Sequence, residues 1–232
     1  MTGRETALAV CDIEHTPSCK LGQTTPQVWH DQSVTQFSRP FQDADTFVTF
    51  EVSLDLENDS DSEATRTFVV RASRNSYSLV DEQVMGTLRG TLIDVRRNPN
   101  ECQSENRSHW QQGGVVGYAH RQVESSHLLV LRGIKVVPEE RGRLLGLFMA
   151  AAAIEQFSAA RRIDVIAKPY PDYDGDEPGQ DYIDEDVEKL RHYFSLLGLR
   201  TLSQNRDWMM MHAEDFDPED FFKRARAVLA GF

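Results

Sequence analysis

The feature that most constrains the fold is a strand, a turn, a helix and a second strand that follow one another closely in the sequence. The run Leu128 to Val137 is apolar, and its only charged residues are Arg132 and Lys135. Such a run is typical of a central strand that is covered on both faces. A Leu- and Ala-rich stretch from about Arg143 to Ala160 has helical spacing, and the apolar run Ile163 to Ala167 follows. This order predicts a βαβ unit with parallel strands and a right-handed crossover.

The first strand of this unit contains a glycine, Gly133. A glycine inside a strand usually marks a β-bulge, or a place where a ligand or another backbone comes close. We therefore expect the strand to be locally splayed, and it is a candidate strand for ligand binding.

The turn between strand and helix has the sequence Arg141-Gly142-Arg143-Leu144-Leu145-Gly146. The start of a helix presents backbone N–H groups without intrahelical acceptors, together with the positive end of the helix dipole. Small residues let this backbone approach a pyrophosphate, and Arg141 and Arg143 add charge-assisted contacts. The turn therefore predicts an anion site in a chain that is otherwise strongly acidic.

Other segments predict the elements that surround this unit. Three β-rich runs, Phe47 to Leu56, Thr67 to Ala72 and Met85 to Val95, favour an antiparallel meander. Further along the chain, we expect a helix near Glu185 to Leu196 and a strand at Arg206 to His212. Asp217 and Pro218 form an N-cap and first-turn pair for a terminal helix.

The composition indicates one globular unit. Of the 232 residues, 40% are hydrophobic and 27% are charged, as in ordinary globular proteins. Residues 1–40 are mixed polar without a lasting period, which predicts a flexible or irregular N-terminal arm. Residues 41–232 are expected to form a single domain.

Charge and cysteine content exclude several classes of function. A net charge of -12 disfavours nucleic acid as a partner. The 3 cysteines form neither a disulfide framework nor a zinc motif, so no metal is expected, and the trio Cys11, His15 and Cys19 is assigned no chemistry. The sequence shows no signal-peptide pattern and no apolar run of membrane-spanning length, so we expect a cytoplasmic protein without a membrane partner.

Two motifs resemble the GNAT superfamily of N-acetyltransferases. Val136 to Gly146 looks like the family's acyl-CoA signature, and Tyr193 to Leu199 is similar to its later helix, which ends at a glycine. Together they cover roughly Leu128 to His212. The resemblance implies a GNAT-like fold of the α/β (α+β) class, with a mixed, centrally splayed β-sheet flanked by helices. It also implies acetyl-CoA, or another acyl-CoA, as co-substrate for residues 41–232.

The resemblance further implies roles for individual residues. Amides from Arg143 to Leu147 hold the CoA pyrophosphate, while Val136 and Ile134 offer strand backbone to the pantetheine arm. The implied cofactor-binding residues are Ile134, Val136, Arg141, Gly142, Arg143, Leu144, Leu145, Gly146 and Leu147.

The sequence departs from the family pattern at three places, and one of them is that the asparagine often found just after the fifth strand has no clear counterpart in Lys168 to Pro171. Leu144 stands where the family usually has glycine, and Phe194 stands where many members carry a tyrosine that protonates the leaving thiolate. Tyr193 is the candidate catalytic acid in its place. One residue along a helix turns a side chain by about 100°, so this role requires a shifted helix.

Two functions therefore stay open. The first is an acyl-CoA-dependent N-acyltransferase that acts on an unidentified amine, either in a small molecule or at a protein lysine or N-terminus. The alternative, favoured by Leu144 and Phe194, is a catalytically inactive binding or regulatory module on the GNAT scaffold. A homodimer is possible in either case.

The general base and the acceptor site are less constrained. A water molecule or one of His120, Glu124 and His127 could act as the base, and the sequence singles out none of them. The acidic run from Asp172 to Asp186 either draws a cationic amine to the site or is a solvated loop.

Overall fold

The computed structural model describes residues 32–36, 46–54, 65–76, 82–95, 125–159, 162–170, 180–203 and 206–230. Most of the predicted N-terminal arm lies outside these residues, as do His120, Glu124 and the acidic residues from Asp172 to Glu177. The predicted arm therefore stays a prediction.

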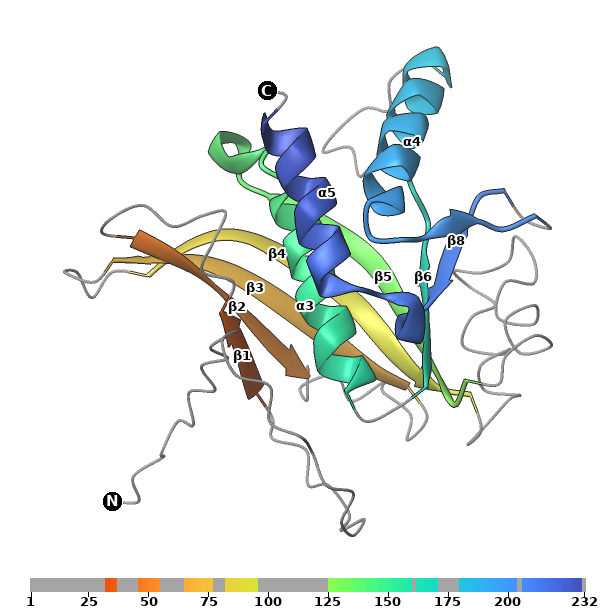
Figure 1. Ribbon diagram of the computed structural model, residues 1–232, viewed down its shortest axis with the longest axis horizontal. Coiled ribbons are helices and arrows are strands. Elements are labelled where there is room, and N and C mark those ends of the chain that lie inside the picture. The colour runs from red at the N-terminus through yellow and green to blue at the C-terminus, as the bar shows by residue number, and fades with distance from the viewer. Residues whose placement is uncertain are drawn as a thin grey trace, which may run out of the picture.

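The first four strands form the predicted antiparallel meander (Figure 1). They are β1 (Gln32–Gln36), β2 (Thr46–Leu54), β3 (Thr65–Ser76) and β4 (Gln83–Asp94), each paired with the next. In β2, Val48, Phe50 and Val52 are buried and the residues between them are half-buried, which is the alternation expected of a strand with one face on a core. The strand β1 comes from a stretch whose composition predicts an irregular arm, so the sheet extends further toward the N-terminus than expected.

The predicted βαβ unit provides the centre of the sheet. The strands β5 (His127–Val136) and β6 (Ile163–Ala167) pair in parallel and are joined by the helix α3 (Leu145–Ser158). Two short strands, β8 (Met209–His212) and β7 (Arg200–Thr201), complete an 8-stranded sheet in the order β1-β2-β3-β4-β5-β6-β8-β7. Every neighbouring pair except β5 and β6 is antiparallel.

The two parallel strands separate halfway along β5. Within the described part of the chain, they pair from His127 to Leu131, and the second half of β5, from Arg132 to Val136, pairs with β4 and not with β6. The register with β4 shifts at this point, because Gly90 faces Leu131 while Arg89 faces Gly133, which leaves Arg132 as a bulge residue. The predicted fold class, a mixed and centrally splayed sheet flanked by helices, is thus confirmed.

Among the described residues, the α-helices α3, α4 (Gln180–Ser195) and α5 (Pro218–Ala230) accompany the sheet. Figure 1 shows α3 and α5 side by side in front of the sheet, and α4 beside β6. The helix α4 starts before the predicted Glu185, so Gln180 to Asp184 belong to a helix and not to the expected acidic loop. Asp217 Oδ1 accepts hydrogen bonds from the amides of Glu219 (2.9 Å) and Asp220 (3.3 Å), which confirms the predicted N-cap of α5.

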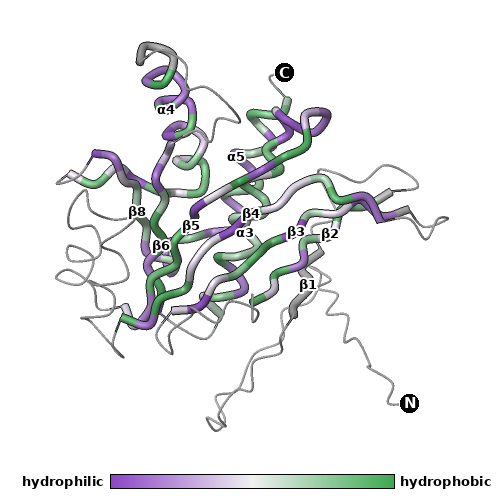
Figure 2. Tube along the Cα trace, turned by 180° about the vertical axis from the view of Figure 1, so that it is seen from behind, coloured by the Kyte–Doolittle hydropathy of each residue, from purple (hydrophilic) through white to green (hydrophobic). Residues whose placement is uncertain are grey.

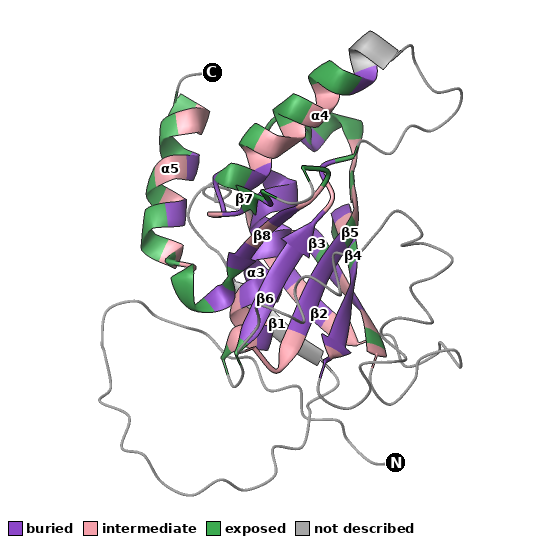
Figure 3. Ribbon diagram, turned by 90° about the vertical axis from the view of Figure 1, so that its right-hand side faces the viewer, coloured by how far each residue is buried: buried purple, intermediate pink, exposed green. Residues whose placement is uncertain are grey.

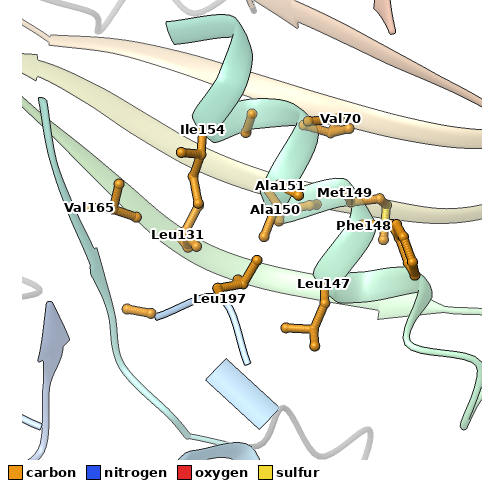
Figure 4. Packing of buried hydrophobic residues seen from close by; sticks show 14 of the residues in the cluster. Val70, Leu131, Leu147, Phe148, Met149, Ala150, Ala151, Ile154, Val165 and Leu197 are labelled. Atoms are coloured by element: carbon orange, nitrogen blue, oxygen red, sulfur yellow. The ribbon is translucent and has the colours of Figure 1, made fainter. Parts of the chain in front are cut away.

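The helix α3 is buried almost all round. Every residue from Leu145 to Ile154 is buried, and not only the predicted stripe. Figure 4 shows its side chains packed among Val70, Leu131, Val165 and Leu197. On the other side, the Phe148 ring lies 5.2 Å from the Phe221 ring of α5, so α5 covers the face of α3 that the sheet leaves open.

The central strands are covered on both faces, as their apolar runs predict. On the face opposite α3, a second apolar cluster contains Ile93, Val95, Leu128, Val130, Ile166 and Leu202. All five residues of β6 are buried, and the strand is hydrophobic in Figure 2 and buried in Figure 3. Among the described residues, no helix is both long enough and apolar enough to span a membrane.

Candidate functional site

The candidate site lies at residues 138–146, which we call the β5–α3 turn. It begins with a 3-10 helix, Pro138–Glu140, and ends where α3 starts. Arg141, Gly142 and Arg143 are exposed, whereas every residue from Leu144 onward is buried for more than two turns of helix. The chain therefore passes from solvent into the core at one residue.

Two residues with positive φ make this sharp entry possible. Gly142 has φ +83°, and a Cβ added to it would meet nothing within 4 Å. Leu144, the N-cap of α3, has φ 58° in the left-handed region, which a leucine adopts at a cost of about 1 to 2 kcal/mol. Its side chain is only 4% exposed and belongs to the main core, so it points inward and away from the exposed side of the turn.

The backbone amides of the turn differ in whether they have an acceptor within the protein. The Arg141 amide donates to Pro138 O (3.3 Å), and the Leu147 amide donates to Leu144 O (2.9 Å). For the amides from Gly142 to Gly146, the described residues offer no hydrogen-bond acceptor. Leu147 was among the predicted pyrophosphate donors, but its amide is used within the protein.

The second half of β5 presents free backbone on the side where β6 has separated. The Val137 amide donates to Met85 O of β4 (2.9 Å), and hydrogen-bonded positions alternate along an antiparallel pair. The backbone groups of Ile134 and Val136 therefore point away from β4. Arg141 Nε donates to Val136 O (3.2 Å), which places this arginine at the same opening.

Gly146 and Tyr193 meet at the start of α3. A Cβ added to Gly146 would lie 2.8 Å from Ile134 Cγ2 and 3.6 Å from the Tyr193 hydroxyl oxygen. The glycine thus allows β5 and α4 to approach the helix start closely. Phe194 is buried in the main core, so α4 directs Tyr193 to the β5–α3 turn and Phe194 away from it.

The Tyr193 hydroxyl is in an apolar setting. Burial raises the pKa of Tyr193 to about 12, and a hydrogen bond with the Leu147 backbone acts weakly in the opposite direction. The phenol is therefore neutral at physiological pH and keeps a proton that it can donate. The sequence predicts that Tyr193 needs a shifted helix to reach the site, but its hydroxyl already lies close to Gly146 of the β5–α3 turn.

Sequence reasoning missed an ion-pair cluster behind the turn. Glu140 is buried and contacts Arg74 Nη2 at 2.5 Å and Arg143 Nη1 at 3.1 Å. Arg74 lies on β3, opposite Val48, whose buried side chain faces the α3 side of the sheet. A glutamate in a polar turn gives no sequence signal of burial, and Arg74 is distant in the chain.

Other candidate residues do not join this site. His127 lies at the start of β5, about 30 Å from Val136 at the usual strand rise, and its Nδ1 is 2.7 Å from Ser126 Oγ. Among the described residues, no group of three or more His, Cys, Asp and Glu side chains could hold a metal ion.

Comparisons with known proteins give only distant likenesses. The sequence matches no family model and no curated protein. The structure of AtaTR bound with acetyl-CoA is 12% identical and covers 73% of this chain and 94% of that chain, with a TM-score of 0.37. A KacT mutant is 11% identical over 73% and 76% of the two chains, with a TM-score of 0.34. The KacTA–DNA complex is 9% identical over 74% and 77%, with a TM-score of 0.33.

Proposed function

We propose that this chain is an acyl-CoA-dependent N-acyltransferase of the GNAT superfamily, which transfers an acetyl group from acetyl-CoA to an amine. The observation that carries the proposal is the set of amides from Gly142 to Gly146 without acceptors in the described residues, next to the opening between β5 and β6. Such amides at a helix start favour a diphosphate. The exposed Arg141 and Arg143 add positive charge at the same place.

The residues present fit an acyl-CoA. The Leu144 side chain is turned into the core and leaves the exposed side of the turn clear. Gly142 is exposed and has open space beside it. The backbone groups of Ile134 and the amide of Val136 can pair with the amides of a pantetheine arm, as an additional strand would, while Val136 O already accepts a hydrogen bond from Arg141 Nε. These are the roles that the resemblance implies for Ile134, Val136, Gly142, Arg143, Leu144, Leu145 and Gly146.

In the proposed reaction, a neutral amine attacks the thioester carbonyl carbon. The new carbon–nitrogen bond forms, the carbon–sulfur bond breaks, and the amine proton passes to water. The developing oxyanion requires a donor, and a backbone amide on the open side of β5 is the candidate. CoA leaves as a thiolate, and the acceptor leaves as an amide.

Tyr193 is the proposed hydrogen-bond donor to the leaving sulfur. A thiol has an ordinary pKa of about 8.5, well below that of Tyr193 at about 12, so complete transfer of the phenol proton to the sulfur is unfavourable. We infer that Tyr193 stabilises the leaving thiolate as a hydrogen-bond donor, and that solvent supplies the proton afterwards.

Calorimetric titration with acetyl-CoA, followed by measurement of thiol release over a panel of amines, tests the proposal. Gly146→Asp is expected to abolish binding, because its Cβ would lie 2.8 Å from Ile134 Cγ2 and its carboxylate would repel a diphosphate. Gln156→Asp adds the same charge near the other end of α3 and is expected to bind normally. Equal behaviour of wild type and Gly146→Asp would sink the proposal.

Turnover separates the enzyme from the inactive module. Tyr193→Phe is expected to lower the rate of thiol release by about tenfold to a hundredfold while binding is retained, and Tyr170→Phe, an exposed tyrosine after β6, is the matched control. Binding of acetyl-CoA by the wild type without thiol release from any amine would favour the binding or regulatory module.

A further inference from the structure

The Arg74–Glu140–Arg143 cluster uses one buried carboxylate to hold two guanidinium groups. Each carboxylate oxygen of Glu140 has its own partner, Oε1 with Arg74 and Oε2 with Arg143. The exposed fraction of the side chain is 8% for Glu140, 34% for Arg74 and 57% for Arg143. The cluster thus extends from Arg74 on the sheet, through the buried carboxylate of Glu140, to the exposed side chain of Arg143.

The burial of Glu140 fixes this arrangement. A buried carboxylate is costly unless charged partners and hydrogen bonds satisfy it, so Glu140 is strongly held to both arginines. Arg74 belongs to β3, in the middle of the meander, and so ties the β5–α3 turn to a rigid strand. Two positive charges against one negative charge leave the cluster cationic, with its exposed end at Arg143.

This geometry orders an otherwise flexible side chain. An arginine loses much rotamer freedom when it binds an anion, and that loss is smaller when the side chain is already held in place. Arg143 gives only Nη1 to Glu140, so its other N–H donors are available to a ligand. They lie on the same turn as the amides from Gly142 to Gly146.

We propose that Glu140 is a positioning residue for the diphosphate of the acyl-CoA, acting through Arg143 and itself anchored by Arg74. This inference rests on the proposed function. Glu140 does not contact the ligand, and its own negative charge is unfavourable to an anion. Its value lies in the orientation that it imposes on Arg143.

The test compares a ligand that carries the diphosphate with one that lacks it. Glu140→Gln keeps the size of the side chain but replaces one acceptor oxygen with an NH₂ group, which repels a guanidinium. We expect it to bind acetyl-CoA about tenfold more weakly than wild type, with unchanged binding of S-acetylpantetheine. A purely structural role would weaken binding of both ligands alike, and that result would overturn the inference.

Glu139→Gln is the matched control, because Glu139 is the neighbouring residue and is exposed. The substitution removes the same charge as Glu140→Gln. Loss of a negative charge alone favours an anionic ligand, so this variant is expected to bind acetyl-CoA as tightly as wild type or slightly more tightly. The two glutamate variants should therefore change the affinity in opposite directions. Tighter binding by both variants would show that Glu140 acts only through its charge.

Arg74→Gln tests the anchor. If Arg74 acts through Glu140, the single variant weakens acetyl-CoA binding, and the double variant with Glu140→Gln is no weaker than Glu140→Gln alone. Additive losses would mean that Arg74 contacts the ligand independently, which contradicts the inference. Thermal unfolding of each variant shows whether it is folded.

These outcomes also separate the inference from the proposed function. If the wild type binds neither acetyl-CoA nor ADP, a simple carrier of the diphosphate, the proposed function fails and the inference fails with it. If the wild type binds acetyl-CoA and Glu140→Gln binds it equally well, only the inference fails.

Discussion

The conformation of Leu144 leads to a prediction that reverses a general rule. Inside a helix, alanine is more stable than glycine by about 1 kcal/mol. At φ 58° the order should change, because a residue with a Cβ pays about 1 to 2 kcal/mol in the left-handed region and glycine does not. Glycine loses about 0.4 to 1 kcal/mol more on folding through the entropy of the unfolded chain. We therefore expect Leu144→Gly to be more stable than Leu144→Ala by about 0.5 to 1 kcal/mol.

Both variants should nevertheless be less stable than wild type. The Leu144 side chain is 4% exposed, and truncation of such a buried leucine to alanine usually costs about 2 to 5 kcal/mol. Relief of the backbone strain recovers only part of that loss. The leucine is therefore retained for its packing in the core, although the backbone conformation favours glycine.

Urea unfolding of the two variants measures the difference, and Leu147 provides the matched control. Leu147 is fully buried in α3, where φ is not positive, so Leu147→Ala should be more stable than Leu147→Gly by about 1 kcal/mol. The same order at both positions would refute the reasoning. Because the Leu144 side chain points inward, folded Leu144→Ala should also bind acetyl-CoA within about threefold of wild type, a change of less than 1 kcal/mol.

Three further predictions concern stability. Burial raises the pKa of Tyr193 to about 12, so the stability that the neutral phenol contributes is complete below pH 10 and is lost as the pH rises toward 12. Between these pH values, the free energy of unfolding of wild type should fall by roughly 2 to 3 kcal/mol relative to that of Tyr193→Phe, as measured by urea unfolding. Asp217→Ala removes the N-cap of α5 and should cost about 1 kcal/mol, whereas Asp215→Ala, two residues earlier, should cost little. His212→Ala should cost about 1 to 3 kcal/mol, because the buried Asp164 Oδ1 loses its partner at 2.6 Å and keeps only the Ser125 hydroxyl at 2.9 Å among the described residues. If the urea unfolding midpoint of Asp217→Ala or of His212→Ala equals that of wild type, the hydrogen bond assigned to that side chain does not stabilise the protein.

Local sequence patterns suffice to predict the order and type of most elements and to locate the candidate site. The apolar runs of β5 and β6, the Leu- and Ala-rich α3 and the glycines of the turn are local patterns, and local hydrogen bonding and periodicity translate them directly into strand, turn and helix. The bulge near Gly133 and the N-cap at Asp217 follow from the same local chemistry. The early start of α4 and the strand β1 were missed, because polar segments gain their structure from packing and pairing partners.

The side chains that meet at the turn come from elements that are distant in the sequence. Arg74 and Glu140 are 66 residues apart in the chain, and no local pattern indicates that one buried carboxylate joins them. Likewise, the packing of α4 directs Tyr193 to Gly146 and buries Phe194, and the core draws Leu144 inward against the preference of its backbone. The physical reason is that burial and ion pairing depend on the distance between elements in space, which the packing of the sheet and helices determines.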